Sequence, residues 1–283
     1  MDFPTLMFFR ATSKENLALV QEELLSSFNS HLGTAVPSPK ALANVLLDHD
    51  GIAMGYPVLR FFLRLPPDAS LILRLRVPYD AFHAVLEHLI GYQGGNIAVD
   101  DDGRVLIRPY GPNAFAHIQT PVGKVSLLTV RNQDIITPAC HAPLTAVAVY
   151  ASPQHFGMLW PTLTFARRAL ASGIIRSPSA DDAYLLDMGF EVKLWPWCWP
   201  DLGIPPQTCA ASRFMCPHQF RHTCDKGVMR ATLHPFNGDR FAPDIAFRLN
   251  AHRPCRGDCM NRQGTHGEVY QPASILDAPD AST

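Results

Sequence analysis

The chain has 283 residues, of which 47% are hydrophobic and 17% charged, a composition typical of a globular protein with a sizeable core. Its formal net charge is −1, so overall charge does not favour nucleic acid or an anionic membrane as a partner. No window of about 18 uncharged apolar residues occurs, so we expect no membrane-spanning helix and no membrane partner.

The N-terminus and the cysteines predict an intracellular protein. Asp2 stands where a secretory signal carries basic residues, and the apolar run that follows it ends at Arg10. The seven cysteines are an odd number, which favours a reducing compartment over a disulfide framework. We therefore expect the protein in the cytoplasm or the nucleus.

The first 65 residues predict three helices and one strand. Apolar residues recur at helical spacing over residues 12–31, after Thr12 or Ser13 as the cap, and again from Ser38 or Pro39 through ALANVLL. Residues 51–54 are apolar and predict a buried strand. Gly55 is then the turn into a helix over residues 58–65.

Residues 70–77 predict a strand with one apolar face. Arg74 and Arg76 alternate with Leu73, Leu75 and Val77, and successive side chains of a strand point to opposite faces. The two arginines therefore share a face, which we expect to be open to solvent.

The next predicted elements run from residue 80 to residue 130. A helical stripe of apolar residues ends at Gly91 or the pair at 94–95. Residues 96–108 predict two short strands around the turn sequence DDDG, and residues 124–130 predict a strand buried on both faces.

The second half predicts more helices. One is expected near residues 141–153, beginning after Pro138 or Pro143. A second includes Arg167 and Arg168 and closes at Gly173, and a third over residues 181–188 ends at Gly189. The order of elements predicts an α/β or α+β fold with a mixed β-sheet flanked by helices.

The chain divides into three predicted segments. Residues 1–34 form a helical segment and residues 35–190 the main domain. Residues 191–283 form an irregular extension rich in proline, cysteine, histidine and tryptophan, and from about residue 262 it has the composition of a loose tail.

The element order resembles that of uncharacterised fungal proteins with a nucleotidyltransferase-like domain. The resemblance rests on the Gly51–Gly55 stretch, the strand over 70–78, the helix over 82–92, and the segments KVSLLTVR, ITPACHAPLTAVAVY and WPTLTFARRAL. It covers about residues 35–175 and rests mainly on this layout. In that superfamily a Gly–Gly or Gly–Ser pair opens a helix, and the next strand carries two acids one residue apart. A third acid lies on a later strand, and the two paired carboxylates hold two Mg²⁺ ions on a triphosphate.

Carried over to this chain, the resemblance implies a degenerate relative that lacks the acidic pair. Gly55 fits the first glycine, while Tyr56 stands where a small residue is expected. Ile72 and Arg74 occupy the two acid positions, and Ser126 lies near the third. Isoleucine and arginine cannot ligate Mg²⁺, so we expect neither catalytic residues nor magnesium at these positions.

The two arginines are candidates for an anion site. Side chains at i and i+2 of a strand can grip one phosphate or carboxylate together, and Gly55 and Tyr56 complete the ligand-binding candidates beside Arg74 and Arg76. The alternative is a solvated face of an edge strand, or ion pairs with Asp68, Glu87 or Asp100.

A cluster of cysteines and histidines follows in the extension. The zinc-ligand candidates are Cys209, Cys216, His218, His222, Cys224, Cys255 and Cys259. Their spacing follows no recognised zinc-finger pattern, and buried thiols with surface histidines explain it equally well.

Three tryptophans, Trp195, Trp197 and Trp199, alternate at strand spacing. On one face they would form a surface able to bind a protein partner. The alternative is a core plug beneath a proline-rich loop.

The leading interpretation is a non-catalytic nucleotidyltransferase-like protein that binds a ligand or partner. One alternative is a zinc-stabilised module for macromolecular interaction. The other is an active nucleotidyltransferase whose acids come from elsewhere, such as Asp134, Asp181, Asp182 or Asp225.

Overall fold

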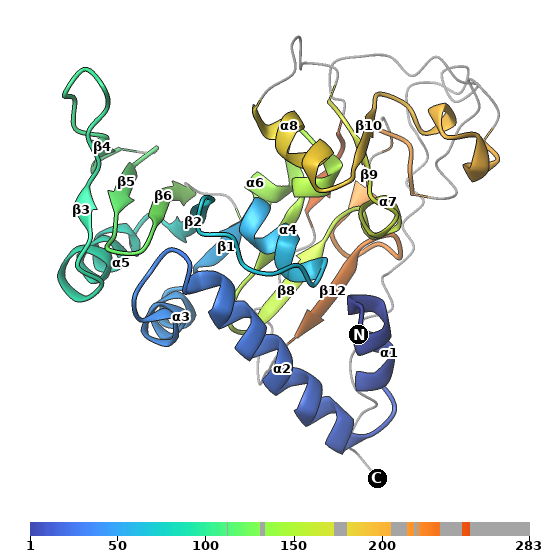
Figure 1. Cartoon of the computed structure of the whole chain (residues 1–283), viewed down its shortest axis with the longest axis horizontal. Helices are drawn as coiled ribbons and strands as arrows, with labels where there is room; N and C mark the ends of the chain where they lie inside the picture. Colours follow the sequence, from blue (N-terminus) through green and yellow to red (C-terminus); the bar gives the residue numbers. More distant parts are fainter. Residues whose placement is uncertain are drawn as a thin grey trace.

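The computed structural model describes residues 1–111, 113–130, 134–172, 180–204, 214–217, 219, 221–232 and 245–249. These residues form a mixed α/β structure in which a sheet of nine strands is flanked by helices (Figure 1). The predicted fold class is confirmed at this level.

The helices are α1 (Phe3–Arg10), α2 (Lys14–Leu32), α3 (Pro39–Asp48), α4 (Tyr56–Phe62), α5 (Phe82–Glu87), a π-helical turn (His88–Tyr92), α6 (Thr137–Cys140), α7 (Pro161–Phe165) and α8 (Ala180–Asp187). The strands are β1 (Ile52–Met54), β2 (Ile72–Pro78), β3 (Asn96–Ile97), β4 (Ile107–Arg108), β5 (Phe115–Gln119), β6 (Lys124–Val130), β7 (Val149–Ala151), β8 (His155–Met158), β9 (Arg168–Leu170), β10 (Glu191–Lys193), β11 (Arg221–His222), β12 (Met229–Thr232) and β13 (Ala246–Phe247). Short 3₁₀ turns lie at Thr145–Val147, Pro196–Cys198 and Pro200–Leu202.

The main sheet has the order β12-β8-β7-β1-β2-β6-β5-β3, and β4 pairs with β5. β2 lies at its centre, antiparallel to β1 and parallel to β6. The parallel pairing runs from Ile72 opposite Lys124 to Pro78 opposite Val130. β9 with β10 and β11 with β13 form two smaller sheets.

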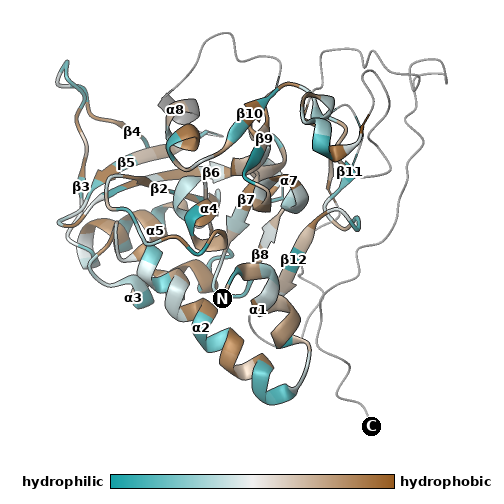
Figure 2. Cartoon of the chain, turned by 45° about the vertical axis from the view of Figure 1, so that its right-hand side comes forward, coloured by the Kyte–Doolittle hydropathy of each residue, from teal (hydrophilic) through white to brown (hydrophobic). Residues whose placement is uncertain are grey.

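One face of the main sheet packs on the N-terminal helices. Leu73, Leu75 and Val77 of β2 join a core with apolar residues of α1 to α5. α2 begins where Ser13 accepts a hydrogen bond from the backbone N–H of Asn16, which satisfies one unpaired amide of its first turn. Along α2, hydrophilic and hydrophobic residues alternate in Figure 2, as expected for a helix with one buried side.

The other face carries a second core over β1, β7 and β8. Ile52, Met54 and Tyr150 pack there with apolar residues of α6, α7 and the described C-terminal segments. β12, from beyond residue 191, pairs with β8 and extends the sheet of the main domain. The guanidinium of Arg10 in α1 donates to the carbonyl oxygen of Thr232 in β12, so the first helix and this late strand are in contact.

Two predicted helices are wrong in whole or in part. Residues 141–153 contain a 3₁₀ turn and β7 instead of a helix, because this apolar stretch is buried between β1 and β8 and its periodicity does not distinguish strand from helix. The helix predicted to include Arg167 and Arg168 ends at Phe165, before both arginines. Arg167 has φ 56° and turns the chain into β9.

Among the helices of the described residues, none combines the length and the apolar character needed to cross a membrane.

The packing of Tyr150 on β7 requires glycine at position 157 of β8. A Cβ at Gly157 would lie 2.5 Å from ring atoms of the buried Tyr150. We expect Gly157→Ala to lower the free energy of unfolding by about 1–3 kcal/mol, because the ring must move within a packed core.

Gly91→Ala is the matched control, since a Cβ at Gly91 meets nothing within 4 Å. It should leave stability unchanged or slightly raised. Urea unfolding of both variants tests the packing, and equal midpoints would contradict it.

Candidate functional site: a basic face of the central strands

The face of β2 opposite the N-terminal helices carries Ile72, Arg74 and Arg76. Arg74 is exposed, Arg76 half-buried, and Ile72 is 42% exposed. The predicted solvent-open face is therefore confirmed. The expectation of an edge strand is wrong, because β2 lies between β1 and β6.

Strand pairing brings three of the sequence positions together. Arg74 is opposite Ser126 of β6, and on its other side it is opposite Met54. Gly55 follows Met54 with φ 81°, a conformation that favours glycine, and a Cβ there would lie 3.5 Å from Cδ of Arg74. Gly55, Arg74 and Ser126 are thus neighbours at the centre of the sheet.

Tyr56 does not join this group. Its side chain is buried among the residues of the helical layer, and its ring meets that of Tyr184 in α8 edge-to-face at 4.9 Å. Three of the four ligand-binding candidates, Gly55, Arg74 and Arg76, therefore lie near one another at the basic face of β2. The fourth, Tyr56, is buried in the helical layer.

Arg76 is the half-buried cation of this face. Nε of Arg76 is buried and has no hydrogen-bond partner among the described residues. Burial and, second, the neighbouring charge of Arg74 lower the pKa of Arg76 from its ordinary value. Within the described part of the chain, Arg76 takes part in no ion pair.

Two of the acids expected to pair with the arginines are engaged elsewhere. Asp68 lies 3.8 Å from Arg60 and accepts a hydrogen bond from the hydroxyl of Tyr184 at 3.0 Å. Asp100 accepts from the backbone N–H groups of its own turn, including that of Arg104 at 2.7 Å. Glu87 is exposed on α5, whose apolar side packs on the opposite face of the sheet.

Further basic residues share the face of the arginines. Cross-strand partners lie on the same face of a sheet. Lys124 is opposite Ile72, His117 is opposite Ser126, and Arg108 is opposite Phe115. These three residues were not predicted from the sequence, because their place depends on which strands pair, and strand pairing leaves no local signal in the sequence.

The cysteine–histidine region is organised without a recognisable metal centre in its described part. Cys216 is buried in the second core, while His222 and Cys224 are half-buried on and after β11. No three His, Cys, Asp or Glu side chains of the described residues are arranged to hold a metal. Four zinc candidates, Cys209, His218, Cys255 and Cys259, lie outside the described residues.

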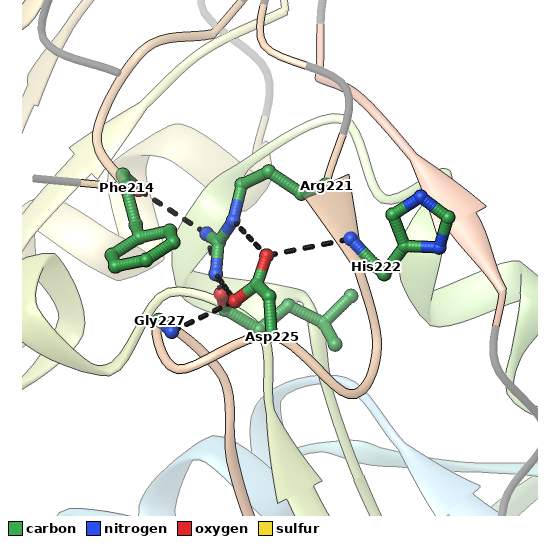
Figure 3. Close-up of polar contacts among 6 residues, drawn as sticks. Phe214, Arg221, His222, Asp225 and Gly227 are labelled. Carbon is green, nitrogen blue, oxygen red and sulfur yellow. Dashed lines mark hydrogen bonds and ion pairs between the residues drawn. The ribbon is translucent and has the colours of Figure 1, made fainter. Parts of the chain in front are cut away.

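A buried ion pair occupies the centre of this region (Figure 3). Arg221 donates from Nε and from one terminal nitrogen to the two carboxylate oxygens of Asp225, at 2.9 and 2.8 Å. Its other terminal nitrogen donates to the carbonyl oxygens of Leu159 and Phe214. The guanidinium lies 4.6 Å from the ring centroid of Trp160, and the two charged side chains are 0% and 3% exposed. Asp225 is therefore committed to this pair.

Among the other acids proposed for an active enzyme, Asp134 is exposed and precedes α6 by three residues. The side chains of Asp181 and Asp182 lie outside the described residues.

The three tryptophans do not share a face, because a 3₁₀ turn replaces the expected strand. The rings of Trp195 and Trp197 stack on each other at 4.5 Å and 13°. Trp199 is buried beneath Arg168, and its indole N–H donates to Glu191 at 2.8 Å. The expected surface of three tryptophans is thus reduced to one half-buried pair.

Comparison with models of known protein families gives no match to this sequence, and no curated protein matches it significantly.

The buried ion pair generates a prediction about stability. Asp225→Asn leaves the Arg221 charge buried without its counter-ion, and we expect a loss of about 3–5 kcal/mol in the free energy of unfolding. The control is Asp201→Asn, which removes an exposed partner of Arg168 at 2.7 Å. Exposed pairs contribute little, so this variant should unfold close to the wild type in urea. Similar midpoints for the two variants would contradict the structural role of the pair.

Proposed function

We propose that the chain is a non-catalytic nucleotidyltransferase-like protein that binds a phosphate-bearing ligand on the face of β2. The observation that carries the proposal is the adjacency of Gly55, Arg74 and Ser126. These are the positions at which the resemblance implies the helix-opening glycine, an acid of the pair and the third acid. In this chain Arg74 puts a cation at the second position of the acid pair, and Ser126 puts a hydroxyl near the position of the third acid.

The strand order supports the assignment of these positions. β1, Gly55, α4 and β2 follow one another as the resemblance implies, and β6 lies beside β2 in parallel register. Ile72 and Arg74, one residue apart, point to the same face as the paired acids would.

The chemistry of the residues supports binding without a bridging metal. In an active relative the carboxylates hold Mg²⁺, and the metal neutralises the triphosphate. Guanidinium groups neutralise phosphate oxygens directly through charge-assisted hydrogen bonds. An anion between Arg74 and Arg76 would also relieve the repulsion that contributes to the lowered pKa of Arg76.

Calorimetric titration with ATP in EDTA tests the proposal. We expect binding without Mg²⁺, and a loss of affinity on the order of tenfold in Arg76→Gln, because a hydrogen-bonding charge is removed from the phosphate. The control is Arg104→Gln, which removes the same charge from a side chain that is 78% exposed and pairs with Asp102. Its affinity should equal that of the wild type.

Three outcomes would contradict the proposal. ATP binding that requires Mg²⁺ would indicate a working metal site. ATP binding unaffected by Arg76→Gln would place the ligand elsewhere. If ATP does not bind at all, the proposal of a phosphate-bearing ligand is wrong. Thermal unfolding of each variant verifies that the fold is retained.

A further inference from the structure

The geometry points to a single-stranded nucleic acid as the ligand of this face, lying across β2, β6, β5 and β4. This inference rests on the proposed function, and it names the class of phosphate-bearing partner that the wider surface fits.

The cations of the face extend well beyond the two arginines of β2. One row of paired residues runs from Arg76 through Leu128 and Phe115 to Arg108. The row crosses four neighbouring strands, which lie about 4.8 Å apart, so Arg76 and Arg108 at its two ends are separated by about 14 Å. Lys124 pairs with Ile72, two residues before Arg74 on the same face of β2. The phosphates of a single nucleotide reach one end of this array, whereas a strand of several nucleotides reaches all of it.

The face is basic although the chain is not. Among the described residues, the same face of β2, β6, β5 and β4 carries two arginines from β2, Lys124, Arg108 and His117, and no acidic side chain. Lys124 and Arg108 are exposed and belong to no ion pair within the described part of the chain. A polyanion is therefore attracted to this face despite the net charge of −1.

Aromatic side chains are interleaved with the cations. Phe115 and His117 both lie on β5, with ring centroids 5.7 Å apart, and both are half-buried. Rings held on a sheet beside basic residues are the usual stacking platforms for unpaired bases.

A hollow lies at the edge of the array, between the sheet and the hairpin that connects β3 to β4, in which Val99 pairs with Val105. Its volume is about 490 Å³, and Ile72, Val99 and Leu106 contribute its apolar wall. His117, Gln119 and Lys124 contribute its polar part. Val99 and Ile72 are 55% and 42% exposed, so apolar surface is available here to the flat side of a base.

These features together favour nucleic acid over an acidic peptide. A polyglutamate chain would satisfy the cations and leave the rings and the hollow unused. Duplex nucleic acid would keep its bases stacked inside the helix, where neither feature reaches them.

Fluorescence anisotropy with a labelled oligouridine of about eight nucleotides tests the inference across a range of salt concentrations in EDTA. The variant Lys124→Gln/Arg108→Gln removes two exposed cations that lie outside the pair on β2. We expect the slope of log affinity against log salt to fall by about 1.4, since each phosphate contact on a single strand contributes about 0.7. Arg104→Gln, on the turn of the hairpin, should leave the slope unchanged.

A second variant tests stacking separately from charge. Phe115→Leu keeps an apolar side chain of similar size in β5, and we expect it to weaken oligouridine binding on the order of tenfold with no change in the salt slope. An unchanged affinity would contradict the stacking role.

The inference and the proposed function fail in different ways. An unchanged salt slope in the double variant, or equally tight binding of polyglutamate or duplex RNA, would overturn the inference. If ATP binding still depends on Arg76 in that case, the anion site stands without the extended partner. If the protein binds neither ATP nor oligouridine, the anion site and the extended nucleic-acid site are both wrong.

Discussion

Side chains alternate along β2 between the buried face of the sheet and its basic face, and this alternation positions both the core and the candidate site. Leu73, Leu75 and Val77 point into the core beneath the N-terminal helices, so Arg74 and Arg76 must lie on the other face. Because β2 pairs with β1 on one side and β6 on the other, the arginines stand at the centre of the sheet. A slip of one residue in this register would bury both charges, which fixes the pairing strongly.

The two ends of this sheet face are covered differently. Over β7 and β8, the second core and the Arg221–Asp225 pair hold the described C-terminal segments against the sheet. Over β2, β6 and β5, arginine, lysine and histidine side chains take the place of an apolar layer. The same sheet therefore provides a packed support at one end and a charged surface at the other, and the ligand proposed here uses only the second.

Local signals predicted much of the first half of the fold. The helix cap at Ser13, one of the two caps predicted, the turn at Gly55 into α4 and the alternation in β2 each depend on near neighbours in the chain, and each is found in the structure. β7 was missed because a strand buried on both faces has the same apolar run as a buried helix. Partners distant in sequence left no signal. Examples are the pairing that places Arg108 and His117 on the same face of the sheet as the arginines of β2, and the burial of Arg221 against Trp160.

The proposed function requires that positions 72 and 74 correspond to the metal-binding acids of an active relative. It is tested most directly by replacing both, as Ile72→Asp/Arg74→Asp, and titrating this variant and the wild type with ATP in Mg²⁺ and in EDTA. Both side chains are at the exposed face, so the fold should tolerate the change. We expect the wild type to bind ATP equally in both buffers. The variant should bind only in Mg²⁺, because two carboxylates one residue apart on a strand can hold the ion. A variant whose ATP affinity does not depend on Mg²⁺, or a wild type that requires Mg²⁺, would contradict the correspondence.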